Sequence, residues 1–213
     1  MAYSNFSLDQ AITNFQLQEN YHSLFEDMIP IPPSDWLIEA LDLGRRLALP
    51  GGSEKARSEF LIAPIFLELE RHYRDRLAVY SGCNLRADPH QNLDGECDFL
   101  LARGPGGLMV RAPILSVVEA KRDNVEGGIG QCVAQMVGVQ IFNQLAAQPE
   151  TKAADHIGSD NLGLVFGCVT TGEIWQFLRL DGTSLTIDRD HFYIERLERL
   201  LAAFRACLEE TLS

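Results

Sequence analysis

Hydrophobic residues at helical spacing predict two helices in the first quarter of the chain. Ser7 and Gln10 have the spacing of a capping box, which predicts a short helix beginning there. Residues 30–33 (Pro-Ile-Pro-Pro) break helical structure, and Ser34 is a favourable N-cap for a second helix that the next Pro-Gly-Gly ends. The apolar positions of this second helix are Trp36, Leu37, Leu41 and Leu47. We therefore expect residues 1–52 to form a helical appendage on the main domain.

The next stretch changes from helical spacing to strand-like runs. Ser53 begins a helix over residues 54–76, in which Pro64 is expected to cause a kink or a local break. Apolar, β-rich segments then predict strands over residues 77–85, 96–102 and 114–120, with a glycine-rich turn at 103–107 joining the last two. This part of the chain therefore predicts one helix followed by three strands.

The last third returns to a helix and then to strands. Gly127-Gly128 precedes a long helix over 129–147, and residues 161–169 have the pattern of a buried strand. Thr171-Gly172 is a hairpin turn leading into a partner strand over 173–180. A short strand over 184–187 and a helix over 192–208 complete the prediction. The order helix, three strands, helix, strands, helix indicates an α/β domain over residues 53–213.

The composition adds no structural element to this prediction, but it excludes several classes of protein and kinds of site. The net charge of −12 argues against a protein that coats nucleic acid without sequence preference. Residues 1–42 hold seven acidic residues and no lysine or arginine, whereas residues 43–122 hold twelve of the eighteen bases. The sequence contains no apolar run of membrane-spanning length and no signal-peptide pattern, so we expect a cytoplasmic protein without membrane contact. The five cysteines stand singly, which favours reduced thiols over disulfides or a zinc site.

The residues that suggest chemistry are charged side chains inside apolar strands. Side chains alternate between the two faces of a strand, so Glu119 and Lys121 point to the same face. If the strands over 96–102 and 114–120 pair, Asp98 comes close to Glu119. Charges at such positions are costly to bury without partners. Two carboxylates and one ammonium group at one strand end suit a Mg²⁺ ion, which binds one or two carboxylates together with waters and phosphate oxygens.

The pattern of Asp98, Glu119 and Lys121 resembles the PD-(D/E)XK nuclease superfamily, and the likeness covers roughly residues 54–180. Cys97 stands where the proline of that motif would be. The resemblance implies a restriction-endonuclease-like αβββαβ core, with a mixed central sheet flanked by helices and the helical N-terminal appendage beside it. Residues 58–64, 95–98, 119–121, 130–132 and 170–177 also resemble a group of bacterial proteins that is common in cyanobacteria.

The family's functional residues transfer to matching positions of this chain. Asp98 and Glu119 would bind the metal, and Lys121 would position the attacking water or stabilise the transition state. The resemblance also implies a glutamine on the following helix, either Gln131 or Gln135. A further acid on the helix before the sheet would be Glu59 or Glu54, and less readily Glu68. Of these we select Glu59 as the third metal ligand.

Each candidate also has a purely structural explanation. Asp98 could cap a turn, Glu119 and Lys121 could form an exposed ion pair, and Gln131 could cap its helix. Gln135 and Glu59 could be ordinary solvent-exposed positions on helices.

The resemblance implies a Mg²⁺-dependent nuclease, with Mn²⁺ as a substitute metal, that hydrolyses phosphodiester bonds in nucleic acid, most simply in DNA. The alternative is a catalytically inactive nuclease-like domain that binds a protein or a nucleic acid, and RNA is a further possible substrate. The overall negative charge requires either a narrow basic cleft or a partner that brings the substrate. The acidic N-terminal segment suggests a homodimer interface or a docking surface for a protein partner.

Overall fold

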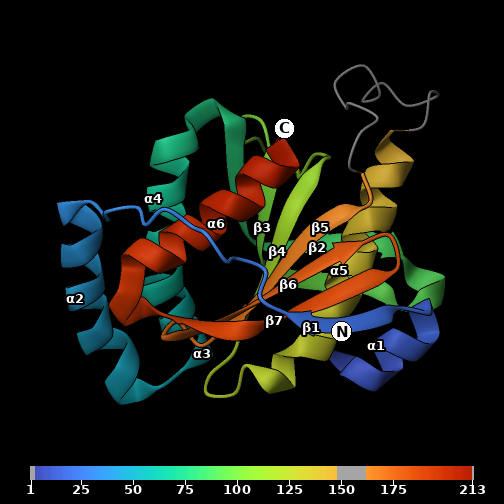
Figure 1. Cartoon of the computed structure of the whole chain (residues 1–213), viewed down its shortest axis with the longest axis horizontal. Coiled ribbons are helices and arrows are strands. Elements are labelled where there is room, and N and C mark those ends of the chain that lie inside the picture. The colour runs from blue at the N-terminus through green and yellow to red at the C-terminus, as the bar shows by residue number, and fades with distance from the viewer. Residues whose placement is uncertain (1–2, 148–161, 213) are drawn as a thin grey trace.

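The computed structural model describes residues 3–147 and 162–212, which form an α/β fold with a seven-stranded mixed sheet flanked by helices (Figure 1). The strand order across the sheet is β1-β7-β6-β5-β4-β3-β2. The strands are β1 (Gln18–His22), β2 (Leu77–Asp88), β3 (Leu93–Arg103), β4 (Ile114–Ala120), β5 (Leu164–Thr170), β6 (Ile174–Asp181) and β7 (Ser184–Tyr193). The α-helices are α1 (Leu8–Phe15), α2 (Asp35–Gly51), α3 (Glu54–Arg57), α4 (Ala63–Tyr73), α5 (Glu126–Ala146) and α6 (Leu197–Leu212).

Helices cover both faces of this sheet. Neighbouring strands pair antiparallel except β4 with β5 and β1 with β7, which are parallel. Helix α5 follows β4 in the chain and packs with α1 against one face, whereas α4 and α6 cover the other and α2 packs against α4 (Figure 1). The central strands β4 and β5 are buried along their whole length. A charged side chain on β4 is therefore enclosed between the sheet and a helix.

The two predicted N-caps are confirmed. The Ser7 hydroxyl accepts a hydrogen bond from the Gln10 backbone N–H at 3.2 Å, and the Gln10 side chain accepts one from the Ser7 N–H at 3.0 Å. The Ser34 hydroxyl accepts from the Leu37 N–H at 3.2 Å. Helix α2 is capped at its C-terminus by Gly52, whose φ of +58° lies in the left-handed region that glycine adopts without strain.

The predicted break at Pro64 is a π-helical turn over Ser58–Ile62, which joins α3 to α4. Pro64 has no backbone N–H, so it cannot make the usual helical bond to the Phe60 carbonyl. The Phe60 backbone lies against Gly44 of α2, and a Cβ at position 44 would overlap the Phe60 carbonyl oxygen. This close approach fixes α2 beside the helix that follows it in the chain.

The structure corrects the secondary structure predicted near the two ends of the chain. Residues 18–22, within the segment expected to be helical, form β1, which pairs with β7. All five residues of β1 are exposed, so no hydrophobic alternation announces the strand. The last helix begins at Leu197, because β7 continues to Tyr193 and Phe192 pairs with Trp175 of β6. The predicted start of β5, Asn161, lies outside the described residues.

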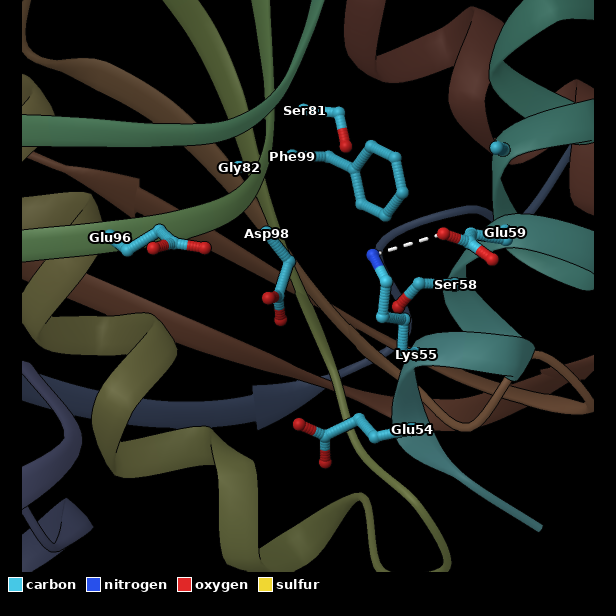
Figure 2. A pocket seen from close by; sticks show the side chains of 10 residues that line it. Glu54, Lys55, Ser58, Glu59, Ser81, Gly82, Glu96, Asp98 and Phe99 are labelled. Carbon is cyan, nitrogen blue, oxygen red and sulfur yellow. Dashed lines mark ion pairs between the residues drawn. The ribbon is translucent and has the colours of Figure 1, made fainter. Parts of the chain in front are cut away.

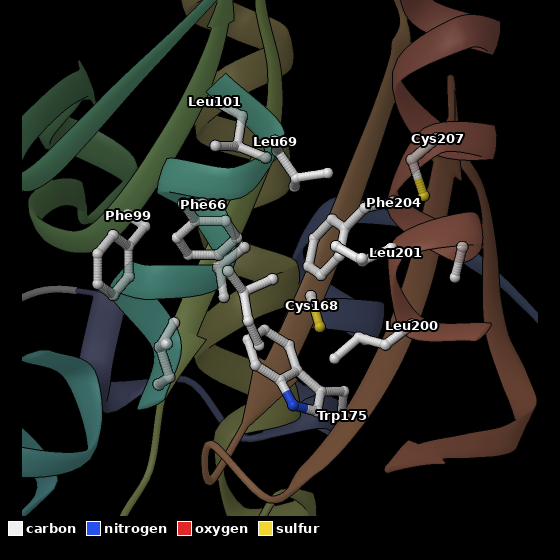
Figure 3. Packing of buried hydrophobic residues seen from close by; sticks show 14 of the residues in the cluster. Phe66, Leu69, Phe99, Leu101, Cys168, Trp175, Leu200, Leu201, Phe204 and Cys207 are labelled. Atoms are coloured by element: carbon white, nitrogen blue, oxygen red, sulfur yellow. The ribbon is translucent and has the colours of Figure 1, made fainter. Parts of the chain in front are cut away.

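An aromatic cluster joins α4 and α6 to the sheet (Figure 3). Phe66 of α4 and Phe204 of α6 have ring centroids 5.6 Å apart and meet edge to face. Both rings meet Trp175 of β6 in the same geometry, at 6.2 Å and 5.6 Å. The thiols of Cys168 and Cys207 lie in the same core, and all five cysteines are free, as the sequence predicts. No helix in the described part of the chain is long and apolar enough to cross a membrane.

Candidate active site

The three charged residues singled out from the sequence lie together where β4 ends beside the middle of β3. Phe99 pairs with Val118, and the same antiparallel register places Asp98 beside Glu119. The Asp98 carboxylate accepts a hydrogen bond from the Ala120 N–H at 2.7 Å. Lys121 follows β4 directly, and its backbone N–H donates to the Thr170 carbonyl of β5 at 2.7 Å. Backbone pairing thus fixes the positions from which these side chains extend.

Glu119 and Lys121 form an ion pair that is largely enclosed. The Lys121 Nζ donates to Glu119 Oε1 at 2.6 Å, and the Glu119 residue is only 3% exposed. Val118 and Ala120 pack into the core on the opposite face of β4. This arrangement excludes the explanation that the pair is an exposed surface ion pair of little energetic consequence.

Both predicted glutamines of α5 contact this pair. The Gln131 side-chain oxygen accepts a hydrogen bond from Lys121 Nζ at 3.2 Å. One turn later, Gln135 donates to the second oxygen of Glu119 at 2.8 Å. Gln135 is fully buried and its own side-chain oxygen has no partner. Burial therefore excludes the structural explanation in which Gln135 is an ordinary solvent-exposed helix position.

Glycine at the start of α5 permits this close contact between helix and sheet. The predicted helix over 129–147 begins earlier in the structure, because residues 126–128 already belong to it. A Cβ at Gly128 would overlap the Val169 side chain and press on that of Lys121. The role of Gly128 was missed, because a glycine pair at this place is more typical of a turn than of a helix interior.

The electrostatics of the site are those of two carboxylates that share one ammonium group. Burial raises the pKa of Glu119 to about 7, and the negative charge of Asp98 acts in the same direction. Burial also raises the pKa of Asp98. Burial alone would lower the pKa of Lys121, but the charge and hydrogen bond of Glu119 outweigh it and raise that pKa. Lys121 therefore stays protonated. One ammonium group does not neutralise two carboxylates, so a bound cation would be stabilised beside them.

A cleft of about 290 Å³ opens beside Asp98, between β2–β3 and the helix that starts at residue 54. Glu54 and Glu59 both line this cleft, and Figure 2 shows Asp98 between them and Glu96. Glu59 forms an ion pair with Lys55 at 2.9 Å. Glu54 acts on the site itself, because its negative charge contributes to the raised pKa of Lys121.

Glu68, the third acid considered for the helix, lies elsewhere. It is buried and accepts hydrogen bonds from the Ser34 backbone N–H at 2.9 Å and the Ser34 hydroxyl at 2.8 Å. Arg71 donates to the same carboxylate at 3.2 Å. Glu68 thus holds the start of α2 and does not line the cleft beside Asp98.

The donor set at the site suits a hard divalent cation without forming a complete cage. Asp98 and Glu119 supply carboxylate oxygens, which Mg²⁺ prefers. No group of three or more histidine, cysteine, aspartate or glutamate side chains within residues 3–147 and 162–212 is placed to hold a metal ion together. Two carboxylates fit Mg²⁺ nonetheless, because this ion keeps several waters and takes oxygens from a phosphate substrate.

The cleft is acidic, which bears on how a substrate would reach it. Its charged lining comprises four acids and a single base, namely Glu54, Glu59, Glu96, Asp98 and Lys55. The narrow basic cleft suggested by the sequence is therefore not present beside Asp98. Lys55 was not predicted, although its position four residues before Glu59 is a signal for a helical ion pair.

No protein-family model matches the sequence, and no curated protein is significantly similar to it. The functional argument therefore depends on the geometry of the site and on the residue pattern.

Proposed function

We propose that this protein is a metal-dependent nuclease that hydrolyses phosphodiester bonds, with DNA as its substrate. The observation that carries the proposal is the convergence of Asp98, Glu119 and Lys121 at one strand end, with two glutamines of α5 bonded to them. Three buried or half-buried charged groups at one place are expensive to maintain. Such clusters of buried charged groups occur most often at catalytic or binding sites.

The order of elements around the site supports a restriction-endonuclease-like core. The helix formed by α3 and α4 precedes β2, β3 and β4, and α5 then leads to β5. This is the αβββαβ order that the PD-(D/E)XK resemblance implies. Asp98 on the second of these strands, and Glu119 and Lys121 at the end of the third, agree with the expected positions of the motif.

In the proposed reaction, each residue has a role that follows from its surroundings. Asp98 and Glu119 would hold Mg²⁺, which when bound polarises a phosphate oxygen and lowers the pKa of a coordinated water. Lys121 remains positively charged and would donate a hydrogen bond to the attacking water or to the developing negative charge on phosphorus. Gln131 accepts from Lys121 and limits the directions in which its ammonium group can point.

The acidic cleft favours a substrate that arrives together with metal ions. A phosphodiester backbone is repelled by the carboxylates that line the cleft, and bound Mg²⁺ would offset this repulsion. We therefore expect cleavage to depend on divalent cations for substrate binding as well as for the chemical step.

Cleavage of a panel of substrates tests the proposal. Linear duplex DNA, single-stranded DNA, branched DNA and RNA of matched sequence are each incubated with Mg²⁺, Mn²⁺ or EDTA. We expect DNA fragments with either metal and none with EDTA. Preferential cutting of RNA would reassign the substrate. Intact substrates under every condition would favour the alternative of a nuclease-like domain that only binds.

Glu54 and Glu59 are expected to differ in their importance for cleavage. Replacing Glu54 with glutamine should lower the cleavage rate by about tenfold, because Glu54 lines the cleft beside Asp98 and the loss of a group that supports a metal site typically costs that much. The Glu59→Gln variant should retain nearly full activity, because Lys55 already neutralises Glu59. Initial cleavage rates of the two variants, measured at saturating Mg²⁺, show which of the two acids contributes more to cleavage. The reverse ranking would restore Glu59 as the acid that serves the metal.

A further inference from the structure

Apart from Ile38 of α2, five large apolar side chains are exposed on the outer helices of the fold. They belong to α2, to the π-helical turn and to α4, and each is between 37% and 59% exposed. The residues are Trp36, Leu43, Leu47, Phe60 and Leu67. We call this set the α2–α4 apolar surface. Soluble proteins that act alone rarely expose large contiguous apolar surface, so such a surface commonly marks an interface.

The two helices that carry this surface lie side by side. The Arg71 guanidinium of α4 is 5.7 Å from the centre of the Trp36 ring near the start of α2. Towards the other end, Gly44 meets the backbone and Cβ of Phe60. These contacts at two levels align the helices, so that the side chains of both contribute to one surface.

The spacing along α2 is that of a helix-pairing seam. Trp36, Ala40, Leu43 and Leu47 are separated by four, three and four residues, the alternation that brings apolar positions onto one stripe for packing against another helix. Leu37, Leu41, Gly44 and Ala48 form a separate, buried stripe that faces the protein's own core. Helix α2 therefore has one apolar stripe that is used within the chain and a second that is not covered.

The charges beside the exposed stripe of one α2 helix complement those of a second, antiparallel copy of α2. Glu39 and Arg46 are both exposed and stand on the outer side of the stripe, one towards each end. When two copies of α2 pack antiparallel about a two-fold axis, Trp36 meets the partner's Leu47 and Ala40 meets the partner's Leu43. In this register Glu39 faces the partner's Arg46, and the symmetry repeats the pair.

We propose that the α2–α4 apolar surface is the interface of a homodimer formed by antiparallel packing of α2 from two copies of this chain. A second copy is favoured over an unrelated partner because the charge pattern complements its own reversed copy, as an isologous interface requires. Arg46 is 2.8 Å from Asp42 of its own helix, in a solvent-exposed pair that leaves it able to turn towards a second acid. The proposal is independent of nuclease activity.

Sedimentation or light scattering of the full chain over a concentration series reaching the sub-millimolar range tests the dimer. We expect the native protein to have twice the monomer mass of 23.8 kDa. Leu43→Glu places a charge at the centre of the stripe and should give a monomer. Leu43 is 52% exposed, so the variant should keep its fold, which circular dichroism and the melting temperature verify.

A charge exchange tests the antiparallel register. Arg46→Glu and Glu39→Arg each bring like charges together twice per dimer and should raise the dimer dissociation constant by about tenfold. The double variant Glu39→Arg/Arg46→Glu should recover nearly native affinity. A native protein that is monomeric throughout, or a Leu43→Glu variant that still dimerises, would overturn the proposal. A double variant no tighter than the singles would overturn the antiparallel arrangement.

Discussion

Replacing Lys121 with alanine is expected to lower the rate of DNA cleavage by about 10³-fold, the typical effect of removing a group that stabilises transition-state charge. The Lys121 ammonium group is held by Glu119 and Gln131 at 2.6 Å and 3.2 Å, so it already has a defined place before substrate binds. An alanine side chain supplies neither its charge nor its hydrogen bonds. Single-turnover rates at saturating Mg²⁺ measure the effect on the chemical step.

Lys55 provides the matched control, because it is a lysine that lines the cleft beside Asp98 and pairs with Glu59 instead of with Glu119. Its partner is the exposed acid Glu59, and Lys55→Ala should change the single-turnover rate by no more than about threefold. Melting temperatures of both variants show whether Lys121→Ala, which leaves Glu119 without its ion-pair partner, disturbs the fold. Equal rates for Lys121→Ala and the native protein would remove Lys121 from the proposed reaction.

Replacing Phe66 with alanine is expected to lower the free energy of unfolding by about 3–5 kcal/mol, the usual range for a buried phenylalanine. Phe66 is 1% exposed and meets the rings of Phe99, Trp175 and Phe204, so its loss opens a cavity between α4, α6 and the sheet. Urea unfolding followed by fluorescence or circular dichroism measures the change.

The control for this variant lies on the same helix. Glu70 is exposed, and Glu70→Ala should change the free energy of unfolding by less than about 0.5 kcal/mol. A decrease below about 1 kcal/mol for Phe66→Ala would mean that the aromatic cluster is not a main source of stability. Comparable losses in both variants would indicate a general weakness of α4.

The central strands and their charged residues could be predicted because two signals coincide there. Apolar, β-rich runs between glycine-containing turns define β4, and the observed Ile114–Ala120 agrees with the predicted segment. Glu119 interrupts an otherwise apolar run, and this energetically costly placement marks it as a candidate functional residue. The contact with Asp98 followed once β3 and β4 were assumed to pair, which the register supports.

The apolar pattern of α2 could not be interpreted fully without the fold. Trp36, Leu37, Leu41 and Leu47 are all apolar positions of one helix, but Leu37 and Leu41 are buried whereas Trp36 and Leu47 are exposed. A periodic pattern shows that a helix has an apolar side, and it does not show how much of that side its own core covers. The uncovered part is the basis of the proposed dimer.

The choice of helix acid also depends on tertiary structure. Glu54, Glu59 and Glu68 lie within one helical stretch, and the π-helical turn over Ser58–Ile62 changes the direction in which the residues on either side of it point. Glu68 is bound to Ser34, a contact between residues far apart in the sequence. β1 was missed for a related reason, because its pairing with β7 leaves all of its side chains exposed.

Cleavage and Mg²⁺ binding by the native protein and by Asp98→Asn, measured side by side, are the decisive test of the proposed metal site. Asparagine keeps the size of Asp98 and an oxygen that can accept from the Ala120 N–H, while it removes the charge that would hold the metal. We predict that the native protein binds Mg²⁺ and cuts DNA, and that Asp98→Asn does neither at an unchanged melting temperature. Equal cutting by both proteins, or cutting by the native protein in EDTA, would contradict the proposed metal-dependent site.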